Sequence, residues 1–139
     1  INNEINNLSK RIGQIKPLPE NDSKIEETDG PTRPVAIVKG DKNSIVVNPA
    51  NSGGTRYILA EIYLLRGKAD DKGFQKKVEE KSKLLQAVTT DQLSAEDAKS
   101  LANPATKQRI KAQLKLAYQK LLGKDHPIKD VIISKWILQ

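Results

Sequence analysis

Apolar residues near the start of the chain recur at helical spacing. Ile5, Leu8, Ile12 and Ile15 follow one another at intervals of three, four and three positions, which aligns them along one side of a helix. The pattern predicts an amphipathic helix over residues 1–16. A helix of this length is only marginally stable by itself. We therefore expect this N-terminal stripe to bind a partner, and the alternative is that it packs on its own domain.

The next segment has the composition of a linker. Residues 17–34 contain four prolines and a cluster of acidic residues, which favours an extended chain without a core of its own. Two short apolar runs follow, VAIV at 35–38 and SIVV at 44–47, and the turn sequence GDKN separates them. This arrangement predicts a β-hairpin.

A longer apolar segment begins after the turn-rich sequence NPANSGG. Residues 57–65 are apolar on nearly both faces, which predicts a long and mostly covered strand. Phe74, Val78, Leu85 and Val88 then recur at helical spacing and predict a first core helix.

Capping signals divide the rest of the chain. Ser94 with Asp97 three positions later predicts the cap of a short helix. Asn103 followed by Pro104 predicts the start of a long helix, and Gly123 predicts its end. The predicted buried stripe of the long helix consists of Ile110, Leu114, Ala117 and Leu121. The β-branched and aromatic run VIISKWIL then predicts a closing strand.

The order of these elements predicts a small α+β domain over residues 35–139. Its sheet would contain the β-hairpin, the long strand and the C-terminal strand, and helices would cover one face. A helical connection between the long strand and the last strand predicts that the two are parallel and form a right-handed crossover.

The positive charge of the chain is concentrated in the predicted long helix. The formal net charge is +7, and no acidic residue lies between Asp97 and Asp125. Lys107, Lys111 and Lys115 fall on one side of the apolar stripe together with Tyr118. These three lysines are candidates for binding a partner, and an ordinary solvated face is the alternative.

Candidate catalytic and metal-binding residues are few. The chain has no cysteine, which excludes disulfides, thiol nucleophiles and cysteine-bound metals, and its single histidine, His126, cannot form a triad alone. Gly53-Gly54 precedes a strand and predicts a turn, and the acid pairs at 70–71, 79–80 and 96–97 are interpreted as solvated charge. We expect no catalytic site, no cofactor and no metal.

Because the chain begins at Ile1 and contains no apolar run of membrane-spanning length, we expect it to be a fragment or a processed product.

Three segments of the chain resemble the flagellar basal-body-associated FliL family. VVNPANSGGTRYILAEIYLLRG is similar to the family's first block, in which a glycine-containing loop precedes an Arg/Lys-Tyr strand. KLLQAVTTDQLSAEDAKSLANPATKQRIKAQL is similar to its helical region, and IKDVIISKWILQ to its terminal strand, which ends in an aromatic residue, two apolar residues and Gln. The resemblance covers Ile45 to Gln139.

The resemblance implies a role without catalysis. It implies that residues 35–139 are the periplasmic domain of a single-pass inner-membrane protein, with a stomatin/prohibitin-type (SPFH-like) fold. It further implies a ring-like homo-oligomer that lies beside the flagellar stator units and promotes motility under load. Two alternatives remain open, namely a periplasmic adaptor or binding module of another family and a small basic nucleic-acid-binding protein. Nucleic acid is not the expected partner, because lysines dominate the basic helix and only Tyr118 could stack on bases there.

Overall fold

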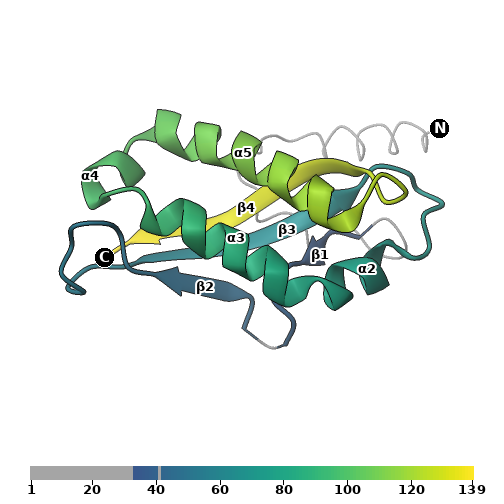
Figure 1. Ribbon diagram of the computed structural model, residues 1–139, viewed down its shortest axis with the longest axis horizontal. Helices are drawn as coiled ribbons and strands as arrows, with labels where there is room; N and C mark the ends of the chain where they lie inside the picture. The colour runs from purple at the N-terminus through teal and green to yellow at the C-terminus, as the bar shows by residue number, and fades with distance from the viewer. Residues whose placement is uncertain (1–32, 41) are drawn as a thin grey trace, which may run out of the picture.

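One antiparallel sheet forms around the longest apolar segment of the chain. In the computed structural model, which describes residues 33–40 and 42–139, β3 (Ile58–Arg66) pairs along its length with β4 (Ile128–Leu138). Two shorter strands, β1 (Val35–Ala36) and β2 (Ser44–Val47), pair with the opposite edge of β3. Helices follow β3 in the chain and lie over the sheet (Figure 1). The prediction of an α+β domain with a small sheet is confirmed.

The predicted β-hairpin is wrong, because β1 and β2 do not pair with each other. Val35 lies opposite Leu64 and Ser44 lies opposite Glu61, so the two strands follow one another along the same edge of β3. Between them the Ile37 amide donates to the Ile62 carbonyl at 3.1 Å, which continues the register of β1. The chain then leaves the edge and returns to it at Ser44. β3 is longer than β1 and β2 together, and it provides both with the backbone hydrogen-bond partners that they would have given each other in a hairpin.

The predicted parallel pairing of the last strand is also wrong. Ile58 lies opposite Leu138 and Arg66 lies opposite Ile128, so β3 and β4 are antiparallel. The connection consists of α2 (Phe74–Glu80), α3 (Ser82–Ser94), α4 (Ala98–Leu101) and α5 (Pro104–Leu122). α2 and α3 lead back along β3, and α5 returns in the opposite direction (Figure 1). Because there are two helical passes rather than one, the chain reaches β4 at the end where β3 stopped.

The capping signals locate helix boundaries well. Asn103 accepts a hydrogen bond from the Ala105 amide at 2.9 Å and caps α5, which ends at Gly123 as predicted. The short helix α4 is capped by Asp97, whose carboxylate accepts from the Ser100 amide at 2.8 Å. Ser94 is instead the last residue of α3. The predicted first core helix is divided at Lys81 into α2 and α3.

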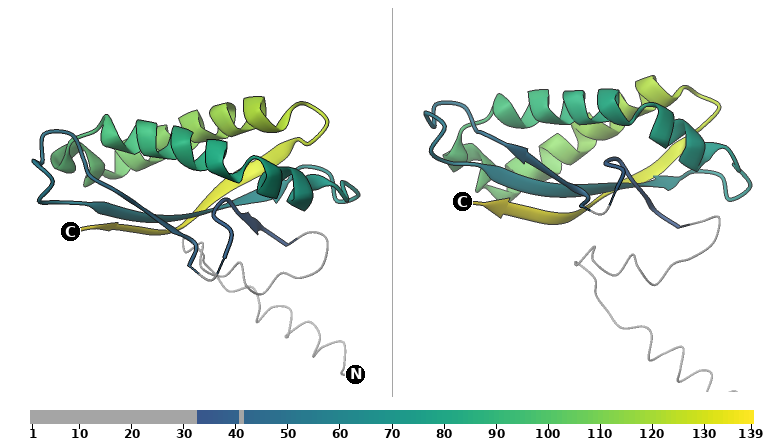
Figure 2. Two further views of the ribbon diagram at one scale, coloured as in Figure 1. Left: turned by 60° about the horizontal axis from the view of Figure 1, so that its bottom comes forward. Right: turned by 90° about the horizontal axis from the view of Figure 1, so that it is seen from below.

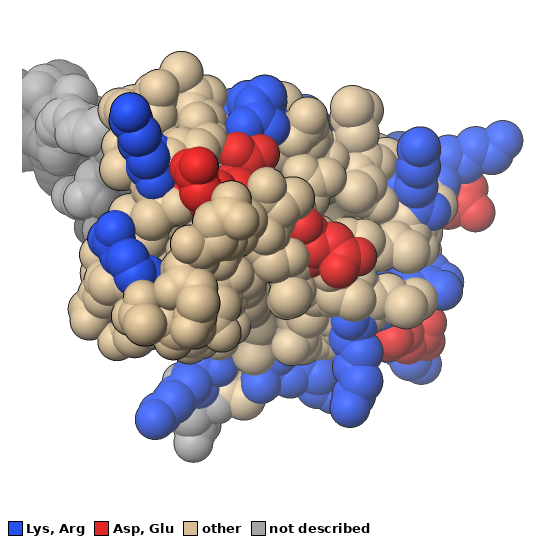
Figure 3. All heavy atoms as spheres, turned by 60° about the vertical axis from the view of Figure 1, so that its left-hand side comes forward, with Lys and Arg blue, Asp and Glu red and all other residues tan. Residues whose placement is uncertain are grey.

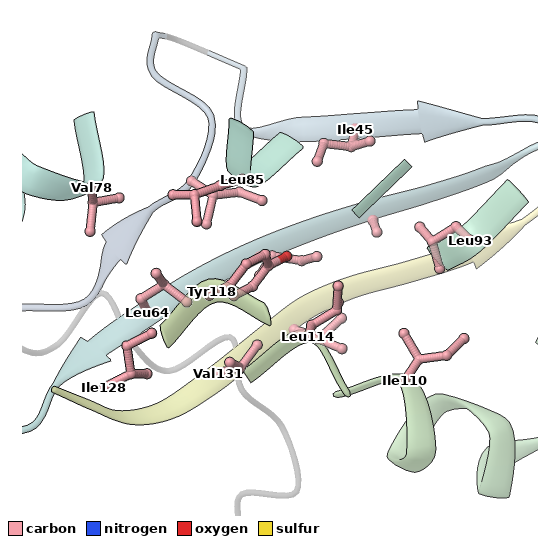
Figure 4. Close-up of a cluster of buried hydrophobic side chains, with 14 of the residues drawn as sticks. Ile45, Leu64, Val78, Leu85, Leu93, Ile110, Leu114, Tyr118, Ile128 and Val131 are labelled. Carbon is pink, nitrogen blue, oxygen red and sulfur yellow. The ribbon is translucent and has the colours of Figure 1, made fainter. Parts of the chain in front are cut away.

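The core lies between the sheet and the helices. Ile110 and Leu114 of the predicted buried stripe are fully buried (Figure 4). Leu121 is partly buried and packs against the same core. Tyr118, predicted to lie with the lysines, is fully buried instead. Its hydroxyl is hydrogen-bonded to the Thr89 side chain on α3, and this partner allows a polar group to be buried beneath α5.

The two faces of β3 differ, although its sequence is apolar at nearly every position. Ile58, Ala60, Ile62 and Leu64 are buried toward the helices. The alternating residues from Leu59 to Leu65 point to the other face and are only partly buried. Among the described residues, no helix packs on that face, and Figure 2 shows α3 and α5 together on the opposite side. The prediction of a long and mostly covered strand is confirmed, since no residue of β3 is fully exposed, and the coverage is greater on the face toward the helices.

Candidate interaction surfaces

The sequence predicts two groups of partner-binding residues, and the structure describes one of them. Ile5, Leu8, Ile12 and Ile15, with the predicted helix over 1–16, lie outside the described residues, as does the predicted linker up to residue 32. Lys107, Lys111 and Lys115 are brought together on one side of α5, outside its fully buried residues. We call these three residues the lysine side.

The lysine side borders a shallow hollow between α5 and β4. Lys111 and Lys115 line this hollow of about 330 Å³, and Asp130 and Val131 form its border on β4. The Asp130 carboxylate accepts a hydrogen bond from the Val131 amide at 2.9 Å, which occupies one of its oxygens within β4. The hollow thus has two lysines on the α5 wall and one aspartate on the β4 wall. This arrangement favours contact with an acidic partner.

Lys107 lies at the other end of the lysine side, next to Trp136. Its ammonium nitrogen is 5.9 Å from the centroid of the indole ring, within the range of a cation–π contact. The indole nitrogen donates to the Leu101 carbonyl at 3.1 Å. Trp136 therefore connects the end of α4 to β4 and supports the start of the lysine side.

Tyr57 and Gln139 pair at the end of the sheet that carries the C terminus. The amide of Tyr57 donates to the Gln139 carbonyl at 3.0 Å, and the amide of Gln139 donates to the Tyr57 carbonyl at 2.8 Å. The tyrosine hydroxyl also donates to the Gln139 side chain at 2.9 Å. Asn48 donates to the Arg56 carbonyl at 2.7 Å and fixes the loop before β3. The first and last segments of the family resemblance are thus neighbours in space.

Glu96, in the link between α3 and α4, connects α4 to α5 at the same end of the domain. Glu96 accepts hydrogen bonds from the Ser100 hydroxyl at 2.6 Å and from the Arg109 guanidinium at 2.9 Å. These two bonds, in that order, lower the pKa of Glu96 below its ordinary value. Figure 3 shows acidic side chains between basic ones on this side of the molecule. The ion pair between Glu96 and Arg109 therefore compensates one charge of each sign within the domain.

The lowered pKa of Glu96 predicts a dependence of stability on pH. The contribution of the ionised carboxylate is present above the ordinary pKa of 4.5 and is lost as the pH falls through the lower value of the folded state. Glu96→Gln should lower the free energy of unfolding by about 0.5–1.5 kcal/mol at pH 7 and by less at pH 3. Urea unfolding at both pH values measures the difference. Glu80→Gln, at a half-exposed partner of Lys77, is the control and should have little effect at either pH. An equal loss from Glu96→Gln at both pH values would contradict the prediction.

His126, the single histidine, has a structural partner. Its Nδ1 lies 3.0 Å from a carboxylate oxygen of Asp71, and the pair joins the loop after β3 to the loop after α5. Asp71 is therefore a partly buried hydrogen-bond partner and not the solvated charge that the sequence predicts.

Within residues 33–40 and 42–139, no group of three or more His, Cys, Asp or Glu side chains could hold a metal ion. None of the helices in this part of the chain is long and apolar enough to cross a bilayer.

A row of apolar side chains crosses the sheet on the face that α3 and α5 do not cover. Val46 on β2 lies opposite Leu59 on β3, and Leu59 lies opposite Ile137 on β4. Val46 is 60% exposed and Ile137 is 42% exposed. We call these three residues the apolar row. Sequence reasoning missed it because Val46 and Ile137 each lie beside other apolar residues, so alternation does not distinguish their faces.

Comparison with known proteins places most of the chain in one family. Residues 41–139 match the family model of the flagellar basal body-associated protein FliL. This range contains β2, β3, β4 and the helices between them. Among curated proteins, none matches the chain.

Proposed function

The chain belongs to the FliL family of flagellar basal body-associated proteins, and from this premise we propose that it supports the stator units of the flagellar motor without catalysing a reaction. Residues 35–139 would be the periplasmic domain of a single-pass inner-membrane protein, with an SPFH-like fold. Several copies would assemble into a ring and promote motility under load. The observation that carries the proposal is the family match over residues 41–139, which implies an accessory role at the basal body.

The lysine side is the proposed contact for an acidic stator segment. Lys111 and Lys115 border the hollow beside β4, and Lys107 is oriented by Trp136. Charges of this kind increase the encounter rate and orient the partner, while an individual exposed pair contributes only about 0.2–1 kcal/mol. No single lysine should therefore be decisive, and the informative change replaces all three.

Changing Lys107, Lys111 and Lys115 together to Glu should reduce swimming and stator recruitment under high motor load. The domain should stay folded, because the three side chains lie outside the buried residues of α5. Stator recruitment is measured by fluorescence of labelled stator units in a flagellated host. Swimming is measured in a viscous medium with protein levels matched.

A second triple variant controls for the change in net charge. Lys83→Glu, Lys120→Glu and Lys124→Glu alter the same number of charges at exposed positions away from the hollow. This variant should recruit stator units nearly as well as the wild type. Full motility of the first variant would show that the lysine side is only a solvated face. Equal losses in the two variants would show that net charge, and not this surface, determines the effect.

A further inference from the structure

The apolar row is a contiguous patch and not three scattered residues. Val46, Leu59 and Ile137 occupy paired positions on three neighbouring strands, so their side chains lie next to one another. Tyr57, 37% exposed, precedes the row on the same face. Single exposed apolar residues are normal on a protein surface, whereas contiguous patches mark interaction sites. An apolar partner on this face would remove the patch from water.

The sequence contains an apolar segment with the dimensions of this patch. The N-terminal stripe runs from Ile5 to Ile15, which corresponds to about 15 Å along a helix. The apolar row crosses three strands, whose outer members are about 10 Å apart. The stripe is thus long enough to cover the row from β2 to β4. An amphipathic helix buries its apolar side most simply against such a flat apolar face.

The position where the described chain begins favours docking on a neighbouring copy. β1 pairs with β3 at Tyr63 and Leu64, about 17 Å along the strand from Leu59. Residues 17–32 precede it, and their prolines and acidic residues favour an extended chain of about 50 Å. A domain of about 100 residues has a radius of gyration of only about 13 Å. The 16 residues from 17 to 32 are therefore long enough for the stripe to reach the sheet of a neighbouring copy.

We propose that the N-terminal stripe of one copy docks on the apolar row of the next copy. The two surfaces are different, so each copy offers one of each and the contact runs head to tail. Head-to-tail contacts close into a ring when the rotation between copies permits, whereas a contact between two identical surfaces stops at a dimer. This proposal rests on the self-assembly that is part of the proposed function. It identifies the two surfaces that would mediate that assembly.

Crosslinking between the two surfaces tests the docking directly. Residues 1–139 contain no cysteine, so Ile12→Cys and Val46→Cys introduce the only thiols of this part of the protein. The full-length protein with both changes, treated with a short bismaleimide in a flagellated host, should give a ladder of dimers and higher multimers. Ile12→Cys with Lys83→Cys is the matched control, because Lys83 is exposed on α3 on the covered side of the sheet. It should give no ladder.

The pattern of products distinguishes the alternatives. A crosslink confined within single chains would show that the stripe packs on its own domain and would overturn the proposal. A ladder that stops at dimers would overturn the head-to-tail arrangement. Absence of crosslinks from a protein that still sediments as an oligomer would overturn the docking surface and leave self-assembly intact. A wild-type protein that sediments as a monomer would overturn self-assembly, and with it the docking.

Substitutions on each surface give an independent measurement. Val46→Lys with Ile137→Lys should weaken association at least about tenfold in sedimentation. The domain should melt as before, because both side chains are exposed. Leu84→Lys with Leu116→Lys makes the same chemical change at exposed positions on the helices and should leave association unchanged. Ile5→Ser, Leu8→Ser and Ile12→Ser together should also weaken association, and a lower melting temperature would contradict the proposal by placing the stripe on its own domain.

Discussion

Leu114→Ala is expected to lower the free energy of unfolding by about 2–5 kcal/mol. Leu114 lies in the middle of α5 and is fully buried between this helix and the sheet (Figure 4). Removing its side chain leaves a cavity that Ile110 and Tyr118, which are fully buried one turn before and after it, cannot fill without strain. Urea unfolding followed by circular dichroism measures the loss.

Leu116 provides a control on the same helix. It is two positions from Leu114 and is 68% exposed. Leu116→Ala removes the same atoms from a side chain that is already in water, and should change stability by less than about 0.5 kcal/mol. A loss below this value for Leu114→Ala would place that face of α5 in solvent. Similar losses from both variants would mean that the burial of Leu114 does not determine the effect, because alanine is at least as good a helix former as leucine.

Local sequence signals, which depend on a few neighbouring residues, were sufficient to predict most of the helices and strands. The Asn103-Pro104 pair and Gly123 gave the bounds of α5, because both act on backbone groups within one turn of the helix. The short helix was also expected, although its cap is Asp97 and not Ser94. Local chemistry of this kind is contained in a few consecutive residues, so a single sequence reveals it.

Pairing between strands was not predictable in the same way. The turn sequence between Ile37 and Ser44 suggested a hairpin. In the structure, the segments before and after this turn both pair with β3 and not with each other. The Ile37 carbonyl is also engaged by the Ser82 hydroxyl at 2.6 Å, which ties the exit from the edge to α3. Such partners are far apart in the chain. Local periodicity therefore cannot identify them.

The candidate surfaces were predicted only in part. Lys107, Lys111 and Lys115 do share one side of α5, because helical spacing determines which residues lie together. The hollow beside them depends on Asp130 and Val131, which reach α5 only through the antiparallel placement of β4. The apolar row likewise requires the register of three strands. Helical spacing predicts a surface on one helix, whereas a surface shared between elements needs the fold.

The hydroxyl group of Tyr118 led to the wrong assignment of this residue to the exposed side of α5. On a helical wheel it lies with the lysines, and its hydroxyl is compatible with an exposed position. In the structure Thr106, Ile110, Leu114 and Tyr118 form one buried row at intervals of four residues. The Thr89 hydroxyl is hydrogen-bonded to the tyrosine hydroxyl and also donates to the Leu85 carbonyl at 2.7 Å. The pair joins α3 to α5 above the sheet.

Tyr118→Ala should therefore cost about 3–5 kcal/mol, because it removes a fully buried ring and leaves a cavity between the two helices. Tyr118→Phe keeps the ring and should cost only about 0.5–1.5 kcal/mol, since Thr89 retains its bond to Leu85. Burial raises the pKa of Tyr118, so the unfolded chain releases this proton first as the pH rises above 10. The wild type should lose stability there, and Tyr118→Phe should lose less. Urea unfolding of all three proteins at pH 7 and at pH 10.5 measures both effects, and equal alkaline losses in wild type and Tyr118→Phe would show that the hydroxyl is not buried.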